Sequence, residues 1–381
     1  IDLDQNATTP LDPLVMEAMR PYWSRGGNAE ARHQAGRAMR RAWDDAVETV
    51  ARVLHADPSE IVFTSGGTEA NNLALFGLAW SRGQDDRAHL VSSPLEHPAV
   101  AGPIDHLASL GWRVDRAIVS SEGMIDPEEM AGLIQSDTRF LTCILAHNEF
   151  GAIGPLGELA ALARDRGVPV HTDAVQAVGR IPVDFRALGV ATLAASAHKF
   201  HGPVGVGVLL VRRDTKLAPL MFGGGQQQGR RPGTPPVALA VGLARALELW
   251  EEDHEARTTR WRSLVGRLED GIIKALGAER AVRIGPSEER FRLPQTLQIG
   301  FPNVDGDVLL MRLDQAGVLC STGSACASGA SRPSSSLVAL GVPPDILRSS
   351  IRFGLGAKTT DEEINESCVI IRKVLSEFQV K

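Results

Sequence analysis

The sequence predicts an α/β protein with two domains, a large one built on a mostly parallel sheet and a smaller α/β domain. Strand and helix patterns alternate through the middle of the chain, at 113–118, 127–134, 139–146 and 156–166. This order favours a parallel sheet with helices on both faces. A chain of 381 residues is long enough for one major and one minor domain. We place the large domain at 13–255 and the small domain at 1–12 and 256–381.

The composition is that of an ordinary globular enzyme, with 43% hydrophobic and 23% charged residues. A net charge of −6 argues against a surface dedicated to nucleic acid. The most apolar strand, 204–211, is far too short to cross a membrane, and the first residues lack a secretory signal pattern. The four cysteines, at 143, 320, 326 and 368, form no C-x-x-C pair, so we expect neither a disulfide framework nor a metal site. These features predict a cytoplasmic protein.

Helical patterns mark three further segments. Apolar residues that include Trp43 repeat at helical spacing over 37–54 and give that helix one buried face. A long helix over 237–276 carries the charged run 251–257, which we interpret as a solvated face, and it leads into the small domain. Before the last helix, Thr360 begins a capping box.

The stretch 61–72 has the pattern of a strand, a glycine turn and the start of a helix. The first backbone N–H groups of a helix have no partner within it, and the Thr68 hydroxyl adds another donor after Gly66 and Gly67. Such a group of donors suits a phosphate, so this turn predicts a phosphate cradle. A Gly-Gly pair alone is weak evidence.

A lysine and an acid follow two neighbouring strand candidates. Lys199 lies between the apolar runs 190–195 and 204–211, and Asp173 ends the preceding strand. Ligands bind at the carboxyl ends of strands in open parallel sheets, and burial there lowers the pKa of a lysine so that its amine can form a Schiff base. The pair matches pyridoxal 5'-phosphate (PLP), which needs an amine for its aldehyde and an anion for its pyridine nitrogen. A lone lysine in such a turn more often lies at the surface.

With the cradle, the acid and the lysine in this order, the chain resembles the group I cysteine desulfurases (NifS/IscS-like). These belong to the class V aminotransferase superfamily and have the fold-type I fold of PLP-dependent transferases. The resemblance runs from 3–10 (LDQNATTP) to 350–353 (SIRF), and its most specific part is 321–326 (STGSAC). That segment is similar to the loop of the family's persulfide-forming cysteine. The resemblance implies an enzyme that takes sulfur from L-cysteine, releases L-alanine and keeps the sulfur as a persulfide on Cys326 for an acceptor protein.

The resemblance also implies roles for single residues. Lys199 would hold PLP and remove the substrate's Cα proton, and His97 would stack over the PLP ring as an acid–base group. Asp173 would keep the pyridine nitrogen protonated. The expected cofactor contacts are Gly67, Thr68, His97, Asn148, Asp173, Gln176, Ser196, His198, Lys199 and Thr234. Thr234 would reach the PLP phosphate of a partner subunit, which implies a homodimer.

Substrate binding is implied for Asn148 and Arg352, since a guanidinium can meet the carboxylate of L-cysteine with two parallel hydrogen bonds. Each of the key residues also has an ordinary explanation. A lone histidine such as His97 is usually structural, and a lone arginine is more often part of a surface ion pair. The small residues around Cys326 offer little to bury, so we expect a mobile loop there, although any exposed thiol can be mobile.

Three positions depart from the family pattern. His147 replaces the first Asn of an N-N-E segment, Gly154 stands where relatives usually have Gln, and Gln227 replaces Glu in the glycine-rich stretch 223–234. The effect of these departures does not follow from the sequence.

Two other functions stay open at this point. The same fold and cofactor serve other lyases and aminotransferases, such as selenocysteine lyase. A silent protein that binds PLP for structure alone is the second alternative. The sulfur acceptor is also open, with iron–sulfur cluster assembly scaffolds, tRNA-thiolation proteins and DNA-modification proteins as the candidate classes.

Overall fold

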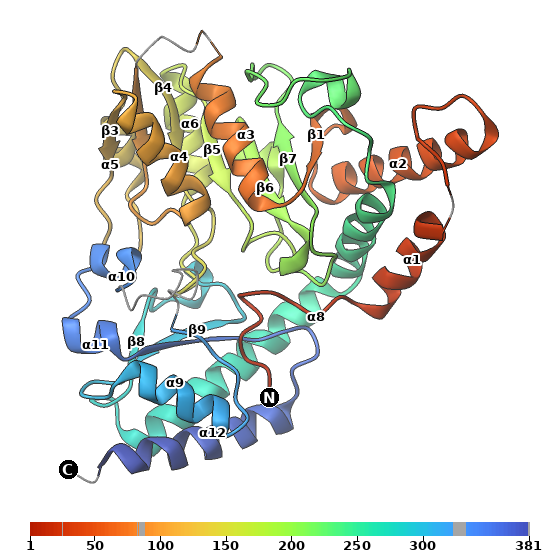
Figure 1. The fold of residues 1–381 in the computed structure, drawn as a ribbon. Helices are drawn as coiled ribbons and strands as arrows, with labels where there is room; N and C mark the ends of the chain where they lie inside the picture. The colour runs from red at the N-terminus through yellow and green to blue at the C-terminus, as the bar shows by residue number, and fades with distance from the viewer. Residues whose placement is uncertain (25, 82, 84–87, 323–332, 380–381) are drawn as a thin grey trace.

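The computed structural model describes residues 1–24, 26–81, 83, 88–322 and 333–379 and confirms the predicted α/β fold (Figure 1). A seven-stranded sheet has the order β1-β7-β6-β5-β4-β2-β3. Its strands are β1 (Ile61–Thr64), β2 (His89–Ser92), β3 (Arg113–Arg116), β4 (Thr138–Thr142), β5 (Val170–Asp173), β6 (Thr192–Ser196) and β7 (Gly207–Val211). Within this sheet β7 runs against both of its neighbours, and the other pairs are parallel.

Helices cover both faces of this sheet because successive side chains of a strand point to opposite faces. Val62 and Phe140 pack on one side, whereas Phe63 and Leu141 pack on the other. The first face is covered by α3 (Gly67–Ala79) and α4 (Pro98–Ser109). The second face is covered by α2 (Gln34–Val53), α5 (Pro127–Gly132), α6 (Leu156–Asp165), α7 (Phe185–Leu188) and the first part of α8 (Val237–Leu276). The helix α1 (Pro13–Ser24) packs along α8.

A second, three-stranded antiparallel sheet has the order β10-β9-β8. Its strands are β8 (Val282–Ile284), β9 (Thr296–Gly300) and β10 (Ser350–Gly354). The helices of this part are α9 (Gly306–Gln315), α10 (Ser335–Ala339), α11 (Pro344–Arg348) and α12 (Asp361–Ser376). The predicted capping box at Thr360 is present at the start of α12.

The 40-residue helix α8 passes from one part of the molecule to the other, as Figure 1 shows. Leu243 and Leu247, near its start, belong to the core of the large sheet, whereas Trp261 and Leu268 belong to the core of the small sheet. Two separate cores that share one helix support a boundary inside α8. We therefore propose the division at residue 255 that the sequence suggested.

The first residues of the chain lie between these two parts. Leu3 N donates to Leu319 O at 2.9 Å, and Leu3 itself is buried in the small core. Thr9 N donates to His198 O at 2.9 Å, beside the large sheet. Gln5 N donates to Gly354 O of β10 at 3.0 Å, so residues 1–9 are hydrogen-bonded to the small sheet at one end and to the turn after β6 at the other. This arrangement positions backbone carbonyls at the edge of the large sheet.

One local prediction differs from the structure. The strand predicted at 204–211 begins only at Gly207, and Val204 is 75% exposed. Gly205 has φ +89°, a left-handed conformation that breaks the strand pattern. Cys320 is half-buried, whereas Cys143 is fully buried. Among the described residues, no helix combines the length and the apolar character that a membrane span requires.

Candidate active site

A cavity of about 320 Å³ lies at the carboxyl ends of β5 and β6, next to the N-terminal segment. The predicted site residues that line it are Gly67, Thr68, His97, Asn148, Asp173, Gln176, Ser196, His198, Lys199 and Arg352. Asn6, Ala7 and Asn71 line it as well. The fold thus brings nearly all of the predicted residues to one place.

Two predicted residues are not part of this wall. Thr234 is exposed and does not line the cavity of its own chain. It follows the loop 223–233, which Gln227 holds against β1. Cys326 lies outside the described residues.

The phosphate end of the cavity is formed by the turn between β1 and α3. Gly66 caps α3 without a side-chain hydrogen bond, so the first N–H groups of this helix are open to a ligand. A Cβ on Gly67 would lie 2.7 Å from Val175 Cγ2, which leaves room only for glycine. Ser196, at the end of β6, lines the same cavity. These donors and the close backbone approach fit a phosphate group.

Asp173 is buried at the end of β5 and is held by a chain of side-chain hydrogen bonds. Asn71 Nδ2 donates to Asp173 Oδ2 at 2.7 Å, and Val175 N donates to Oδ1 at 2.9 Å. Asn71 Oδ1 lies 3.1 Å from His171 Nε2, while His171 Nδ1 lies 2.9 Å from Thr192 Oγ1. Burial lowers the pKa of His171 to about 3, so this ring is neutral and donates from Nε2 to Asn71. The carboxylate is therefore fixed in a single orientation at the cavity wall.

Lys199 ends the short helix η2 (Ala197–Lys199), directly after β6. Its Nζ donates to Asn6 O at 2.8 Å and to Ala7 O at 2.7 Å. Both acceptors are backbone carbonyls of the N-terminal segment. They supply the partners that an amine needs when it leaves water. The N-terminal segment thereby holds the amine in the cavity wall.

His97 is the N-cap of α4, with its Nδ1 accepting from Ala99 N at 3.1 Å. An Nδ1 that accepts must be unprotonated, so the ring proton lies on Nε2. Burial is the main cause that lowers the pKa of His97, and the Lys199 ammonium lowers it further, against the opposite effect of Asp173. His97 is therefore a neutral imidazole near Asp173 and Lys199.

His198 is also neutral at neutral pH. Burial, together with the cations of Lys199 and Arg180, lowers the pKa of His198 to about 4. Its Nδ1 lies 3.1 Å from Thr8 Oγ1, which fixes the ring against the N-terminal segment. His198 can thus serve a ligand as a neutral hydrogen-bonding group.

Arg352 reaches the cavity from β10 of the small sheet and is 4% exposed. Its Nη2 donates to Asp4 Oδ1 at 2.8 Å, and its Nη1 donates to Asn148 O at 3.0 Å. Its Nε is buried and has no hydrogen-bond partner among the described residues. The guanidinium is thus held at two nitrogens and has a third one unpaired.

The polar groups of the cavity fit PLP. Gln176 Nε2 donates to Asn6 O at 2.9 Å, but Gln176 Oε1 is buried without a partner among the described residues. This oxygen and the unpaired Nε of Arg352 are buried polar groups that a polar ligand would satisfy. The helix start at Gly67 suits the phosphate, and the Asp173 carboxylate suits a protonated ring nitrogen.

The three departures from the family pattern now have structural explanations. His147 is buried, does not line the cavity, and stacks on Phe150 with 3.9 Å between ring centroids. A side chain at Gly154 would begin 2.7 Å from Ile144 O, so this site has no room for the Gln of relatives. Gln227 Oε1 accepts from Phe63 N at 2.6 Å and its Nε2 donates to Phe63 O at 3.0 Å. A glutamate there would lack the donor for the carbonyl.

Some residues of this region escaped sequence reasoning. Asn6 and Ala7 act through backbone carbonyls, which no side-chain pattern reveals. Asn71 follows Gly67 by one helical turn, and this spacing places both residues on the same side of the helix. Glu96 is buried directly before His97, and burial together with the Asp173 carboxylate raises its pKa well above the usual value.

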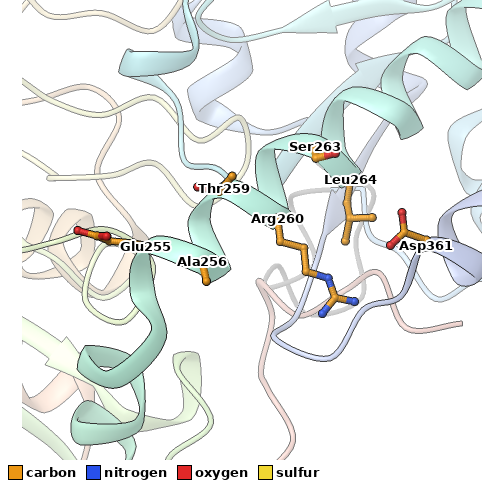
Figure 2. A pocket seen from close by; sticks show the side chains of 7 residues that line it. All are labelled: Glu255, Ala256, Thr259, Arg260, Ser263, Leu264 and Asp361. Carbon is orange, nitrogen blue, oxygen red and sulfur yellow. The ribbon is translucent and has the colours of Figure 1, made fainter.

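A second hollow, of about 430 Å³, shares no lining residue with this cavity, and Figure 2 shows its side chains. It is formed by one side of α8, including Glu255 and Arg260, and by Asp361 at the start of α12. Arg260 Nη2 donates to Thr359 O at 2.7 Å, so this arginine fastens α8 to the α12 cap. Its position away from Lys199 and Asp173 gives it no part in the candidate active site.

The class V aminotransferase family profile matches residues 1–366. This chain belongs to the class V aminotransferase family. Enzymes of this family depend on PLP, in agreement with the geometry of the cavity. The match spans both sheets, so the family resemblance covers the whole site.

Individual relatives and solved structures support the family assignment. An IscS-like cysteine desulfurase of Mycobacterium tuberculosis is 38% identical over 97% of this chain and 94% of its own. A solved structure of a NifS-like protein has a TM-score of 0.91 and 34% identity and covers 99% of both chains. A structure titled SspA in complex with cysteine has a TM-score of 0.82 at 31% identity, covering 94% of this chain and 99% of its own.

Proposed function

We propose that this chain is a PLP-dependent cysteine desulfurase that converts L-cysteine to L-alanine and transfers the sulfur to an acceptor protein. The observation that best supports this proposal is that Lys199, Asp173 and Arg352 line the same cavity. An amine, an anion for the ring nitrogen and a guanidinium for a carboxylate are what PLP chemistry on an amino acid requires. The similarity to cysteine desulfurases over nearly the whole chain supports the choice of reaction.

PLP would be held through its phosphate by the turn at Gly67 and Thr68, with Ser196 and His198 beside it. Lys199 would bind its aldehyde, and Asp173 would hold the ring nitrogen. When bound, PLP supplies an electron-accepting ring for bond breaking at the substrate's carbons. Gln176 Oε1 and the Asn148 side chain are proposed to face the ring oxygen.

Two groups are proposed to move protons. The Lys199 amine, released by an incoming substrate amine, would take the proton from the substrate's Cα. His97 would donate and accept through Nε2, because its Nδ1 is engaged by Ala99 N. Burial keeps the pKa of His97 below the usual value, so the neutral ring is the resting form.

Arg352 is proposed to bind the substrate carboxylate. Its Nε is the unpaired nitrogen, and its link to Asp4 orients the guanidinium in advance. The side chain comes from the small sheet, whereas Lys199 comes from the large one. Substrate binding would therefore depend on both parts of the chain.

Cys326 is proposed, from the sequence alone, as the thiol that receives the sulfur. In the overall change the substrate's carbon–sulfur bond breaks and a sulfur–sulfur bond forms. L-cysteine and the thiol give L-alanine and a persulfide, with all atoms balanced. The acceptor would then attack the outer sulfur. Its class stays one of three: an iron–sulfur scaffold, a tRNA-thiolation protein or a DNA-modification protein.

A homodimer is part of this proposal, because Thr234 does not reach the cavity of its own chain. Large apolar side chains are exposed on α1, at Leu14 and Trp23, and on two loops, at Val204 and Phe222. Exposed apolar side chains of this kind suit a subunit interface. For the compartment we propose the cytoplasm, since the cysteines show no disulfide pattern.

The function is tested by incubating the protein with PLP and L-cysteine and identifying the products by mass spectrometry. The proposal predicts L-alanine together with sulfide when a thiol reductant is present. A keto acid in place of alanine would indicate an aminotransferase. Bound PLP without any product would indicate a silent PLP-binding protein, and either result contradicts the proposal.

A further inference from the structure

Arg180, on the turn after β5, is 2% exposed and contacts both segments that meet at Lys199. Its Nε and Nη2 donate to Lys199 O at 3.0 and 2.7 Å. Nη2 also donates to Gln5 O at 2.7 Å, and Nη1 lies 3.4 Å from Asn6 Oδ1. The guanidinium thus joins the main chain of Lys199 to the segment whose carbonyls receive the Lys199 amine.

Backbone carbonyls and the face of an aromatic ring stabilise the charge of Arg180. No carboxylate of the described residues forms an ion pair with it, and the nearby charges that act on it are the cations Arg257 and Arg352. Its guanidinium carbon lies 5.9 Å from the ring centre of Trp261, whose Nε1 donates to Gly356 O at 2.8 Å. Burial lowers the pKa of Arg180 to about 9, so it remains a cation at neutral pH.

This cation acts on the groups around it. Burial is the main cause that lowers the pKa of His198 and of His201 to about 4, and the Arg180 cation lowers both further. Both rings are therefore neutral at neutral pH. The Lys199 amine and Arg180 both contact Asn6, the amine at the backbone O and Arg180 at Oδ1. The other titratable or charged groups near the amine are His97 and His198, with Asp173 and Arg352 on the wall of the same cavity.

The hydrogen bonds of Arg180 and its buried charge both act on Lys199. Two hydrogen bonds to its carbonyl limit the rotation of the main chain that carries the reactive amine. A buried cation nearby disfavours a second positive charge, because the low dielectric of the interior weakens screening. The Asp173 carboxylate, on the wall of the same cavity, acts in the opposite sense.

We propose that Arg180 is a positioning residue for Lys199. It holds the main chain of Lys199 by a forked contact, and its buried charge favours the neutral form of the Lys199 nitrogen once PLP is bound there. This inference rests on the proposed function, in which Lys199 binds PLP. A purely structural role would affect folding and PLP retention, but not the pH at which the Lys199 nitrogen takes up a proton. The two roles are therefore separable by a pH profile.

The test is a pH titration of the visible absorbance of PLP bound to the full-length protein. Arg180→Gln removes the charge but keeps an N–H donor for a carbonyl. Its titration midpoint should rise by about one pH unit, because one neighbouring cation is lost. Arg180→Lys keeps the charge without the fork, so its midpoint should stay within about 0.3 unit of the wild type. If Arg180→Gln does not fold, Arg180→Met, which also removes the charge, is titrated in its place.

Arg212 provides the matched control. Its Nε donates to Val190 O at 2.9 Å and its guanidinium lies 5.7 Å from the Phe185 ring, but it stands at the opposite end of β6. Arg212→Gln should leave the midpoint unchanged. Equal midpoints in wild type, Arg180→Gln and Arg212→Gln would overturn the inference, as would a shift in Arg180→Lys equal to that of Arg180→Gln.

The failure of this inference and that of the proposed function can be told apart. Borohydride reduction followed by peptide mapping locates PLP on the chain. A label on Lys199 with unchanged midpoints overturns only the role of Arg180. A label on another lysine overturns the assignment of Lys199 and the inference with it.

Discussion

Gly67 and Val175 are in such close contact that a Cβ on Gly67 would lie 2.7 Å from Val175 Cγ2. The two residues belong to different strand–helix connections, Gly67 after β1 and Val175 after β5. Their contact sets the distance between the proposed phosphate cradle and Asp173. A change of side chain at either position therefore alters the geometry of the whole cofactor site.

Gly67→Ala should reduce PLP affinity by about tenfold or more, because overpacking at this contact displaces the helix start or Val175. The measurement is a PLP titration of the cofactor-free protein, followed by absorbance. Val175→Ala removes the clashing methyl group, so the double variant Gly67→Ala with Val175→Ala should recover most of the affinity.

The matched control is Gly157→Ala in α6, where an added Cβ meets nothing within 4 Å. It should keep PLP affinity and gain slightly in stability, because alanine favours a helix over glycine. Normal PLP binding by Gly67→Ala would refute the assignment of this turn to the phosphate.

Arg352→Lys should raise the KM for L-cysteine about 10- to 100-fold, because a lysine keeps the charge but loses the forked contact with a carboxylate. PLP absorbance should stay normal, since Arg352 is assigned to the substrate. Arg312→Lys, at an exposed ion pair with Glu377, is the control and should leave KM unchanged. An unchanged KM in Arg352→Lys would assign the carboxylate to another residue.

His147 should make the fold sensitive to acid. Burial lowers its pKa from 6.5 to about 3, so below pH 6.5 the unfolded chain binds a proton that the folded chain does not. Stability therefore falls as the pH drops from 6.5 toward 3, and at pH 5 this one ring accounts for about 2 kcal/mol. In His147→Asn, the loss of unfolding free energy between pH 7 and pH 5 should be smaller by that amount. Urea unfolding at both pH values measures it, and an identical loss in both proteins would count against a buried neutral ring.

Co-expression of Lys199→Ala and Thr234→Ala chains tests the homodimer. Each variant alone should be inactive. Half of a random mixture is hybrid dimers, which contain one intact site out of two, so about a quarter of wild-type activity should return. An active monomer in sedimentation experiments, or no recovery in the mixture, would argue against sites shared between subunits.

The sequence was sufficient for the fold class and for most of the cavity wall. The roles of Asp173 and Lys199 could be predicted from the sequence because each residue follows an apolar strand. Parallel strands present their carboxyl ends at one edge of the sheet, where ligands bind. The start of β7 was placed too early, because Val204 is apolar but lies in a turn before the left-handed Gly205. Apolar character alone does not separate a strand from the turn that precedes it.

The contacts that support the site could not be predicted from the sequence. The amine of Lys199 is held by carbonyls of Asn6 and Ala7, and any residue type would supply those atoms. Arg180 contacts Lys199 O and Gln5 O across large separations in sequence, so only the tertiary structure joins them. Local patterns identify the side chains that meet a ligand, whereas the backbone contacts that position them follow from the packed fold.

The central claim is that Lys199 is the residue that carries PLP in a cysteine desulfurase. Its most direct test is to reduce the PLP-loaded protein with borohydride, digest it and locate the labelled lysine by mass spectrometry. The account predicts a single label, on Lys199. It predicts no label in Lys199→Ala, a variant that leaves Asp173 and the rest of the cavity wall unchanged. A label on any other lysine in the wild-type protein would contradict it.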